Sequence, residues 1–145
     1  MAAAKPDSNF SPEIVALYCR QCLDAEERPQ EGARPAKGFN ARLVMLPCSG
    51  KVEAYQMLRI LEQGADGVLL VGCPENACRF LVGSRRAEKR LTHAGQLLDL
   101  VNMGAGRLAL KRAADLTTAD ILALAGQLAE RVKTLGPNPM KGDSL

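Results

Sequence analysis

Four short apolar runs divide this chain of 145 residues, at 14–18, 42–46, 68–72 and 108–110. Short, continuous apolar runs are typical of strands that are buried on both faces of a sheet. We therefore interpret each run as one strand of a single buried sheet.

Three other stretches repeat apolar residues at helical spacing. They predict helices at about 53–63 and 85–103, and a third helix that is capped at Thr117 or Thr118 and ends at Gly136. The resulting order, β-loop-β-α-β-α-β-α, predicts a parallel sheet covered on both faces. We therefore expect an α/β fold, a small flavodoxin-like open parallel sheet with strand order 2-1-3-4.

The segment 23–40 interrupts this alternation because it mixes acidic residues with prolines and glycines. We expect a long irregular loop there, with at most a short helix at 24–28, in place of the first crossover helix. We expect a mobile N-terminal arm at 1–11, one domain at 12–136 and a C-terminal tail at 137–145.

Composition narrows the possible functions. Aromatic residues make up 3% of the chain and Trp is absent, so stacking platforms for single-stranded nucleic acid are not expected. The net charge of +3 is too small to indicate a polyanionic partner. No apolar run approaches the roughly 20 residues that cross a membrane, and the polar N-terminus lacks the apolar core of a signal peptide. We expect a cytoplasmic protein whose thiols are reduced and free to bind metal.

The cysteines follow the predicted strands. Cys19, Cys48 and Cys73 come just after the first three apolar runs, and Cys22 and Cys78 follow closely behind. If the strands are parallel, all five sulfurs converge on the carboxyl edge of the sheet, where open α/β sheets bind ligands. Such a group of thiols predicts a metal or redox centre rather than disulfide bonds.

The spacing leaves several kinds of centre open. Iron–sulfur clusters are usually held by four Cys thiolates, and structural zinc accepts four as well. The pattern C-x2-C, lone Cys48 and C-x4-C resembles neither a zinc ribbon nor plant-type ferredoxin spacing. Free Cys is also a common core residue, so one or two of these thiols could simply be buried.

The surroundings of the cysteines would suit an anionic cluster. Cys48 precedes a predicted helix, whose amino end carries partial positive charge. Bases follow the last cysteine and could lower thiol pKa values or offset cluster charge, although they could equally form a solvated helix face. These bases are Arg79, Arg85, Arg86, Lys89 and Arg90.

Five motifs together resemble a known family. They are CRQC at 19–22, LPCSGKV at 46–52, GADGV at 64–68, GCPENACRF at 72–80 and LGPNP at 135–139. The chain is similar, over nearly its whole length, to the delta subunits of methyl-viologen-reducing hydrogenase.

The resemblance implies an electron-transfer subunit that carries one [2Fe–2S] cluster. It would relay electrons between a hydrogenase or other dehydrogenase and the A subunit of heterodisulfide reductase-like complexes, without catalysis of its own. A relay of this kind implies a stable hetero-oligomer, docked through the cysteine edge and the basic run.

Two-iron clusters take four protein ligands, so one of the five cysteines would be spare. We expect Cys19, Cys48, Cys73 and Cys78 to be the ligands, with Cys22 as an alternate ligand or a neighbour of the cluster. Cys48 and Cys73 lie on strand-end turns, whereas Cys22 and Cys78 are expected on flexible loops. The longer C-x4-C spacing favours Cys78 because its loop can wrap around a cluster.

Other residues carry little chemistry. His93 is the only histidine and is expected on a helix surface, and the glycines at 104 and 106 fit a turn. No Ser-His-Asp set or close carboxylate pair is evident. Two alternatives remain: a zinc-stabilised bridging subunit, and a thiol–disulfide protein that uses Cys19 and Cys22.

Overall fold

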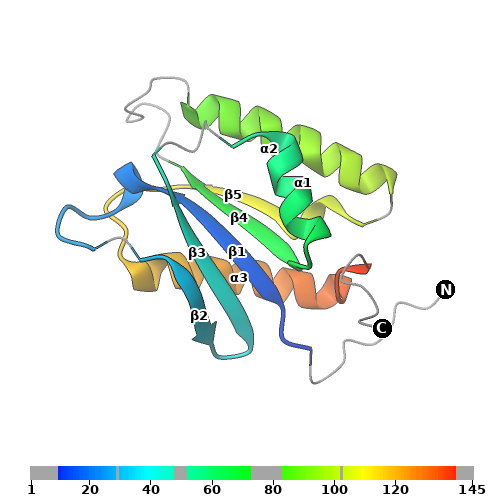
Figure 1. The fold of residues 1–145 in the computed structure, drawn as a ribbon, viewed down its shortest axis with the longest axis horizontal. Helices are drawn as coiled ribbons and strands as arrows, with labels where there is room; N and C mark the ends of the chain where they lie inside the picture. The colour runs from blue at the N-terminus through cyan, green and yellow to red at the C-terminus, as the bar shows by residue number, and fades with distance from the viewer. Residues whose placement is uncertain (1–9, 29, 48–51, 73–82, 102, 140–145) are drawn as a thin grey trace.

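A twisted sheet forms the middle layer of the molecule (Figure 1). The computed structural model describes residues 10–28, 30–47, 52–72, 83–101 and 103–139, with the backbone alone at 83–85. Within these residues the sheet has five strands in the order β2-β3-β1-β4-β5, and only β2 runs antiparallel to its neighbour. The strands are β1 (Glu13–Cys19), β2 (Gly32–Ala36), β3 (Phe39–Leu46), β4 (Gly67–Gly72) and β5 (Leu108–Arg112).

Strand β2 is the main departure from the predicted architecture. The described residues at 24–31 form no helix or strand, but the expected loop does not extend to residue 40, because residues 32–36 pair with β3 across a turn at Lys37 and Gly38. The sheet is therefore mixed, and its order is 2-3-1-4-5 rather than 2-1-3-4. Without β2, the remaining strands lie in the order β3-β1-β4-β5. The sequence of β2, GARPA, is poor in strand-forming residues, so only its hydrogen bonds to β3 define it.

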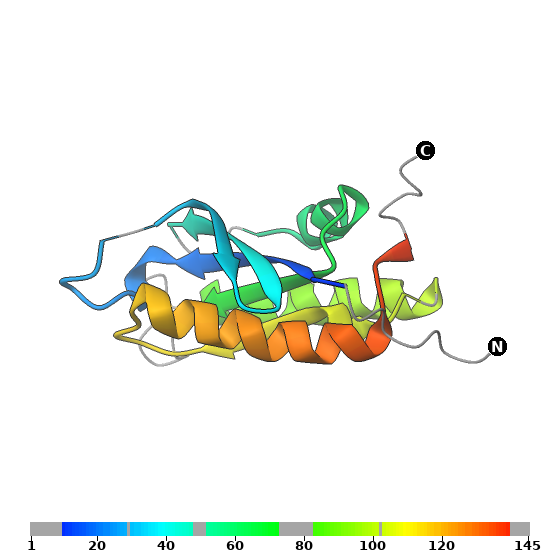
Figure 2. The same ribbon diagram turned by 90° about the horizontal axis from the view of Figure 1, so that it is seen from below.

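Helices cover both faces of the sheet (Figures 1 and 2). Ile14, Ala16 and Tyr18 of β1 pack with α3 (Thr118–Leu135) in one buried cluster. Leu17 packs in a second cluster with residues of α1 (Ala54–Glu62) and α2 (Gly83–Leu100). Successive side chains of β1 point to opposite faces of the sheet, so the strand contributes to two separate cores.

The predicted helices are present, with small shifts at their ends. Helix α1 lies within the predicted 53–63, whereas α2 stops at Leu100 and leaves Val101 63% exposed. Helix α3 begins with the expected cap: Thr117 Oγ1 accepts from Asp120 N at 3.1 Å, and Asp120 Oδ2 accepts from Thr117 N at 2.9 Å. Among the described residues, no helix has both the length and the apolar character that a membrane span requires.

A buried polar network closes the edge of the sheet where the parallel strands begin. The carboxylate of Asp66, just before β4, accepts from Glu13 N and from Asn138 N, each at 2.8 Å. Arg107 is 2% exposed, and its guanidinium donates to the backbone oxygens of Asp66 at 3.1 Å and Gly136 at 2.9 Å. We call Asp66, Arg107 and Asn138 the amino-edge network.

The network also holds the segment that follows α3 in place. The side-chain amide of Asn138 donates to the carbonyls of Leu61 and Ala65, both at 2.6 Å. Asn138 belongs to the stretch assigned to a tail, yet it is buried. Burial lowers the pKa of Arg107, and the charge of Asp66 partly opposes that change. The GADG and GPNP motifs therefore meet at this edge, opposite the end of β1 that carries Cys19.

Candidate metal centre

Two cysteine thiols are buried at the carboxyl edge of the sheet. Cys19 is the last residue of β1 and is 2% exposed, and Cys22 ends a short 3-10 helix, η1 (Arg20–Cys22), and is fully buried. Cys19 Sγ lies 3.9 Å from the backbone oxygen of Pro47, and Cys22 Sγ lies 3.8 Å from that of Val71. Since β3 and β4 flank β1, each thiol contacts the end of a neighbouring strand.

The remaining cysteines, Cys48, Cys73 and Cys78, lie outside the described residues. In the sequence, Pro47 directly precedes Cys48, and Val71 stands two residues before Cys73. Within the ranges that the structure describes, no three Cys, His, Asp or Glu side chains form a metal-binding group. The described part of the site is therefore two thiols and the two strand ends that they touch.

Backbone hydrogen bonds hold the turn at Cys22 in place. The carbonyl of Cys22 accepts from Leu116 N at 2.8 Å, and Asp24 N donates to the carbonyl of Leu116 at 2.8 Å. Leu23 and Leu116 form an isolated parallel bridge between these bonds. The expectation that Cys22 lies on a flexible loop is therefore wrong. The segment before α3, distant in sequence, fixes this turn.

Tyr18 anchors the chain that follows this turn. Its hydroxyl donates to the carbonyl of Gln30 at 2.6 Å and accepts from Gln30 N at 2.9 Å. Burial raises the pKa of Tyr18, so the hydroxyl keeps the proton that it donates. Tyr18 thus ties the strand end beside Cys19 to the start of the β2 segment.

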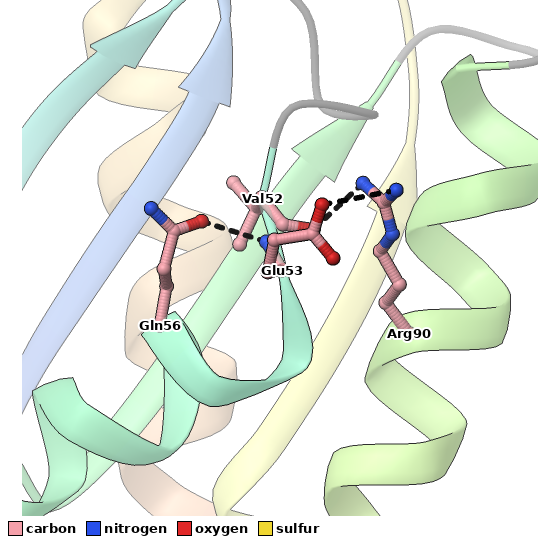
Figure 3. A network of polar contacts seen from close by, with 4 residues as sticks. All are labelled: Val52, Glu53, Gln56 and Arg90. Carbon is pink, nitrogen blue, oxygen red and sulfur yellow. Dashed lines mark hydrogen bonds and ion pairs between the residues drawn. The ribbon is translucent and has the colours of Figure 1, made fainter.

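Arg90 lies beside the amino end of α1 (Figure 3). Its guanidinium donates to the carbonyl of Val52 at 3.2 Å and forms an ion pair with Glu53 at 3.2 Å. Glu53 N in turn donates to Gln56 Oε1 at 2.7 Å. Because Glu53 already balances its charge, Arg90 joins two helices and contributes little net positive charge to the cysteine edge.

The other bases of the predicted run lie on or before α2. Arg86 and Lys89 are exposed, while Arg79 and the side chain of Arg85 lie outside the described residues. Glu88 does form an ion pair, at 2.6 Å, but its partner is Arg112 of β5. His93 is exposed on α2, as expected.

A comparison with protein families matches residues 14–136 to the family described as methyl-viologen-reducing hydrogenase, delta subunit. The chain belongs to this family. The matched region includes all five sheet strands described here apart from the first residue of β1, and all five cysteines. The resemblance drawn from the five motifs is confirmed.

Several relatives of this chain are named iron–sulfur subunits. The vhu iron-sulfur D subunit of the F420-non-reducing hydrogenase of Methanocaldococcus jannaschii is 32% identical over 91% of this chain and 98% of its own length. The protein of the same name from Methanococcus maripaludis is 31% identical over 90% and 97%. The A subunit of the ferredoxin:CoB-CoM heterodisulfide reductase of Methanosarcina mazei is 28% identical over 73% of this chain but only 13% of itself. This chain therefore resembles both iron–sulfur subunits of hydrogenases and part of a heterodisulfide reductase A subunit.

Two contributors to the site were not predicted from the sequence. Tyr18 belongs to the apolar run at 14–18, whose pattern predicts burial and says nothing of the hydroxyl, although a buried Tyr hydroxyl usually needs a nearby partner. Leu116 gave no signal at all, because it acts through its backbone and lies far along the chain from Cys22.

Proposed function

We propose that this protein is an electron-transfer subunit that carries one [2Fe–2S] cluster at the carboxyl edge of its sheet. It relays electrons between a hydrogenase or other dehydrogenase and a heterodisulfide reductase-like A subunit. One observation carries the proposal: the buried thiols of Cys19 and Cys22 touch the ends of β3 and β4, the strands that lead to Cys48 and Cys73.

The described residues fit an iron–sulfur cluster. Both thiols are withdrawn from water, and each sulfur lies 3.8–3.9 Å from a backbone carbonyl oxygen, a weak contact that a metal can replace. In the sequence, Cys48 directly follows Pro47 and Cys73 stands two residues after Val71, so the two residues whose carbonyls these sulfurs touch each lead to a further cysteine. When bound, such a cluster accepts and releases one electron at a time.

The protein's own part in the relay is to hold sulfur atoms in place and keep water away. The hydrogen bonds of Tyr18 to Gln30 and of Cys22 to Leu116 fix the chain on either side of the turn. A rigid, buried set of ligands limits structural change when the charge of a cluster changes, and burial tunes the potential.

Cys19, Cys48, Cys73 and Cys78 remain the proposed ligands, with Cys22 as the alternate. The anchored position of Cys22 makes its thiol a stronger competitor than a flexible loop would have done. Cys22→Ser and Cys78→Ser variants, purified side by side without oxygen, separate the two cases. The true ligand is the one whose replacement removes iron or alters the EPR signal.

Anaerobic purification tests the cluster itself. We expect a brown protein with two iron and two sulfide per chain and a rhombic EPR signal after reduction. A colourless protein with one zinc would instead support a bridging subunit. A metal-free protein that reduces disulfides would support a thiol–disulfide protein. Against this last possibility, Cys19 precedes only a three-residue 3-10 helix, which offers little dipole to stabilise a thiolate.

The partners follow from the relatives. A protein named as a heterodisulfide reductase A subunit contains a stretch similar to 73% of this chain, and domains joined in one polypeptide commonly meet as subunits elsewhere. We call a protein similar to that relative an A-type subunit. We therefore propose a hetero-oligomer in which this chain binds an A-type subunit and a hydrogenase or dehydrogenase subunit. We propose that it binds neither nucleic acid nor a membrane. A cytoplasmic location is part of the same proposal and rests on composition.

A further inference from the structure

The two faces of the sheet are covered unequally at the end that holds β2. On the α3 side of β3, Leu43 is 1% exposed. On the other side of the same strand, Val44 and Leu46 are only half-buried and Arg42 is exposed. Figure 1 shows β2 and β3 with no described helix over them on the side that carries α1.

A groove occupies this uncovered region. It has a volume of about 650 Å³ and runs from Ile60 on α1 across β1 and β3 to Pro35 on β2. Val15, Val44 and Ile60 form its half-buried floor and wall, and Ala33 and Pro35 extend it as exposed apolar residues. Apolar surface gathered in a groove and rimmed by polar residues is typical of an interaction site.

The groove is about one helix wide. Neighbouring strands lie about 4.8 Å apart, so β1, β3 and β2 together span roughly 10 Å from axis to axis. A helix with its side chains measures about 10–12 Å across. Parallel strands are normally covered on both faces, so one further helix beside α1 would complete this layer.

Arg42 stands in the middle of the groove. Its partners in the strand register are Val15 on one side and Ala33 on the other, both apolar. Within the described part of the chain, Arg42 is in no ion pair. An arginine flanked by apolar residues on both neighbouring strands can act as an interface anchor, because its stem packs on them while its guanidinium pairs with a carboxylate.

We infer that an amphipathic helix of a partner subunit fills this groove, with aliphatic side chains against Val15 and Val44 and a carboxylate paired with Arg42. The inference rests on the proposed role of the chain as one subunit of a hetero-oligomer. It adds a docking surface apart from the basic run on α2, on the other side of α1.

Charge argues against a second copy of this chain as the occupant. A two-fold axis through the middle of the groove would bring Arg42 against its own symmetry mate. Two guanidinium groups facing each other away from water would repel strongly. A partner that supplies a carboxylate against Arg42 avoids this repulsion, whereas a second copy would bring only Glu13, the one acidic residue among those that line the groove.

Cross-linking in the assembled complex identifies the occupant. The chain is co-produced with the A-type subunit of the same organism, with the photoreactive residue p-benzoylphenylalanine in place of Ala33. We expect a cross-link to one helical, acidic segment of the A-type subunit. Cross-links only between copies of this chain, or none at all, would overturn the inference.

Charge exchange tests the pairing. Arg42→Glu should weaken the affinity of the chain for the A-type subunit by at least about tenfold, as the loss of a buried charge pair does. Replacing the cross-linked acidic residue of the partner by Lys should restore assembly with Arg42→Glu. Arg59→Glu is the matched control, because Arg59 is exposed on α1 outside this groove, and it should assemble like the unaltered chain. Unchanged assembly of Arg42→Glu would overturn the inference.

Iron content separates this inference from the proposed function. If the chain holds iron but assembles regardless of Arg42, the groove inference fails and the electron-transfer role stands. If the chain assembles through Arg42 but holds no iron, the cluster proposal fails and the docking surface stands.

Discussion

The amino-edge network allows a quantitative prediction, because replacing Asp66 by Asn changes charge and hydrogen bonding with almost no change in volume. The carboxylate of Asp66 offers two oxygens, and each accepts one backbone N–H, from Glu13 and from Asn138. An amide offers one oxygen and one NH2 group. In Asp66→Asn, one of the two N–H groups therefore loses its acceptor and faces another donor.

The magnitude follows from burial. A buried donor left without an acceptor costs about 1–3 kcal/mol. Removing one partner of a buried ion pair costs about 3–5 kcal/mol, but Arg107 donates to the backbone oxygen of Asp66 and not to its carboxylate, so the lower part of that range applies. We expect Asp66→Asn to lower the free energy of unfolding by about 3–4 kcal/mol, a large part of the roughly 5–15 kcal/mol of a typical domain. The melting temperature should fall by roughly 6–16 °C.

Urea unfolding under anaerobic conditions, followed by circular dichroism, measures this loss. Asp115→Asn is the matched control, since it makes the same chemical change at an exposed residue with φ of 56°, where Asn is well tolerated. The control should stay within about 0.5 kcal/mol of the unaltered chain. A loss below about 1 kcal/mol in Asp66→Asn would refute the reasoning, because it would mean that water or a rearranged backbone satisfies the freed group.

Three further predictions concern the cysteine edge. Tyr18→Phe should lower the free energy of unfolding by about 1–2 kcal/mol, because two hydrogen bonds are lost. Since the pKa of Tyr18 is raised above its ordinary value of 10.0, the stability difference between the two proteins should be full below pH 10 and shrink above it. Equal differences in urea unfolding below and above that pH would contradict the assignment. Cys48→Ala and Cys73→Ala should each abolish iron retention in the anaerobically purified protein, and full iron content in both would show that the ligand assignment is wrong. Replacing Arg85 and Arg86 by Glu should weaken partner binding more at low salt than at high salt. If this double substitution leaves assembly unchanged, these bases form only a solvated helix face.

Local patterns in the sequence were sufficient for the helices and the buried strands. The apolar stripe of α3 and its cap at Thr117 could be predicted from the sequence, because a helix is stabilised by contacts between residues three and four positions apart. Strand β4 is readable because all six of its residues are buried and its sequence is correspondingly apolar. Strand β2 was not readable, because its identity comes from hydrogen bonds to β3 and not from its own side chains.

The sequence by itself determined that three cysteines follow three strands of one sheet, since strands are local and parallel strands end at the same edge. Only the tertiary structure decided how the described thiols are held there. Cys22 is fixed by the backbone of Leu116, and Tyr18 is paired with Gln30. The uncovered face around Arg42 is likewise a product of strand order. Contacts of this kind join residues distant in the chain, and no local pattern records them, because the free energy that selects them exists only after the sheet has formed.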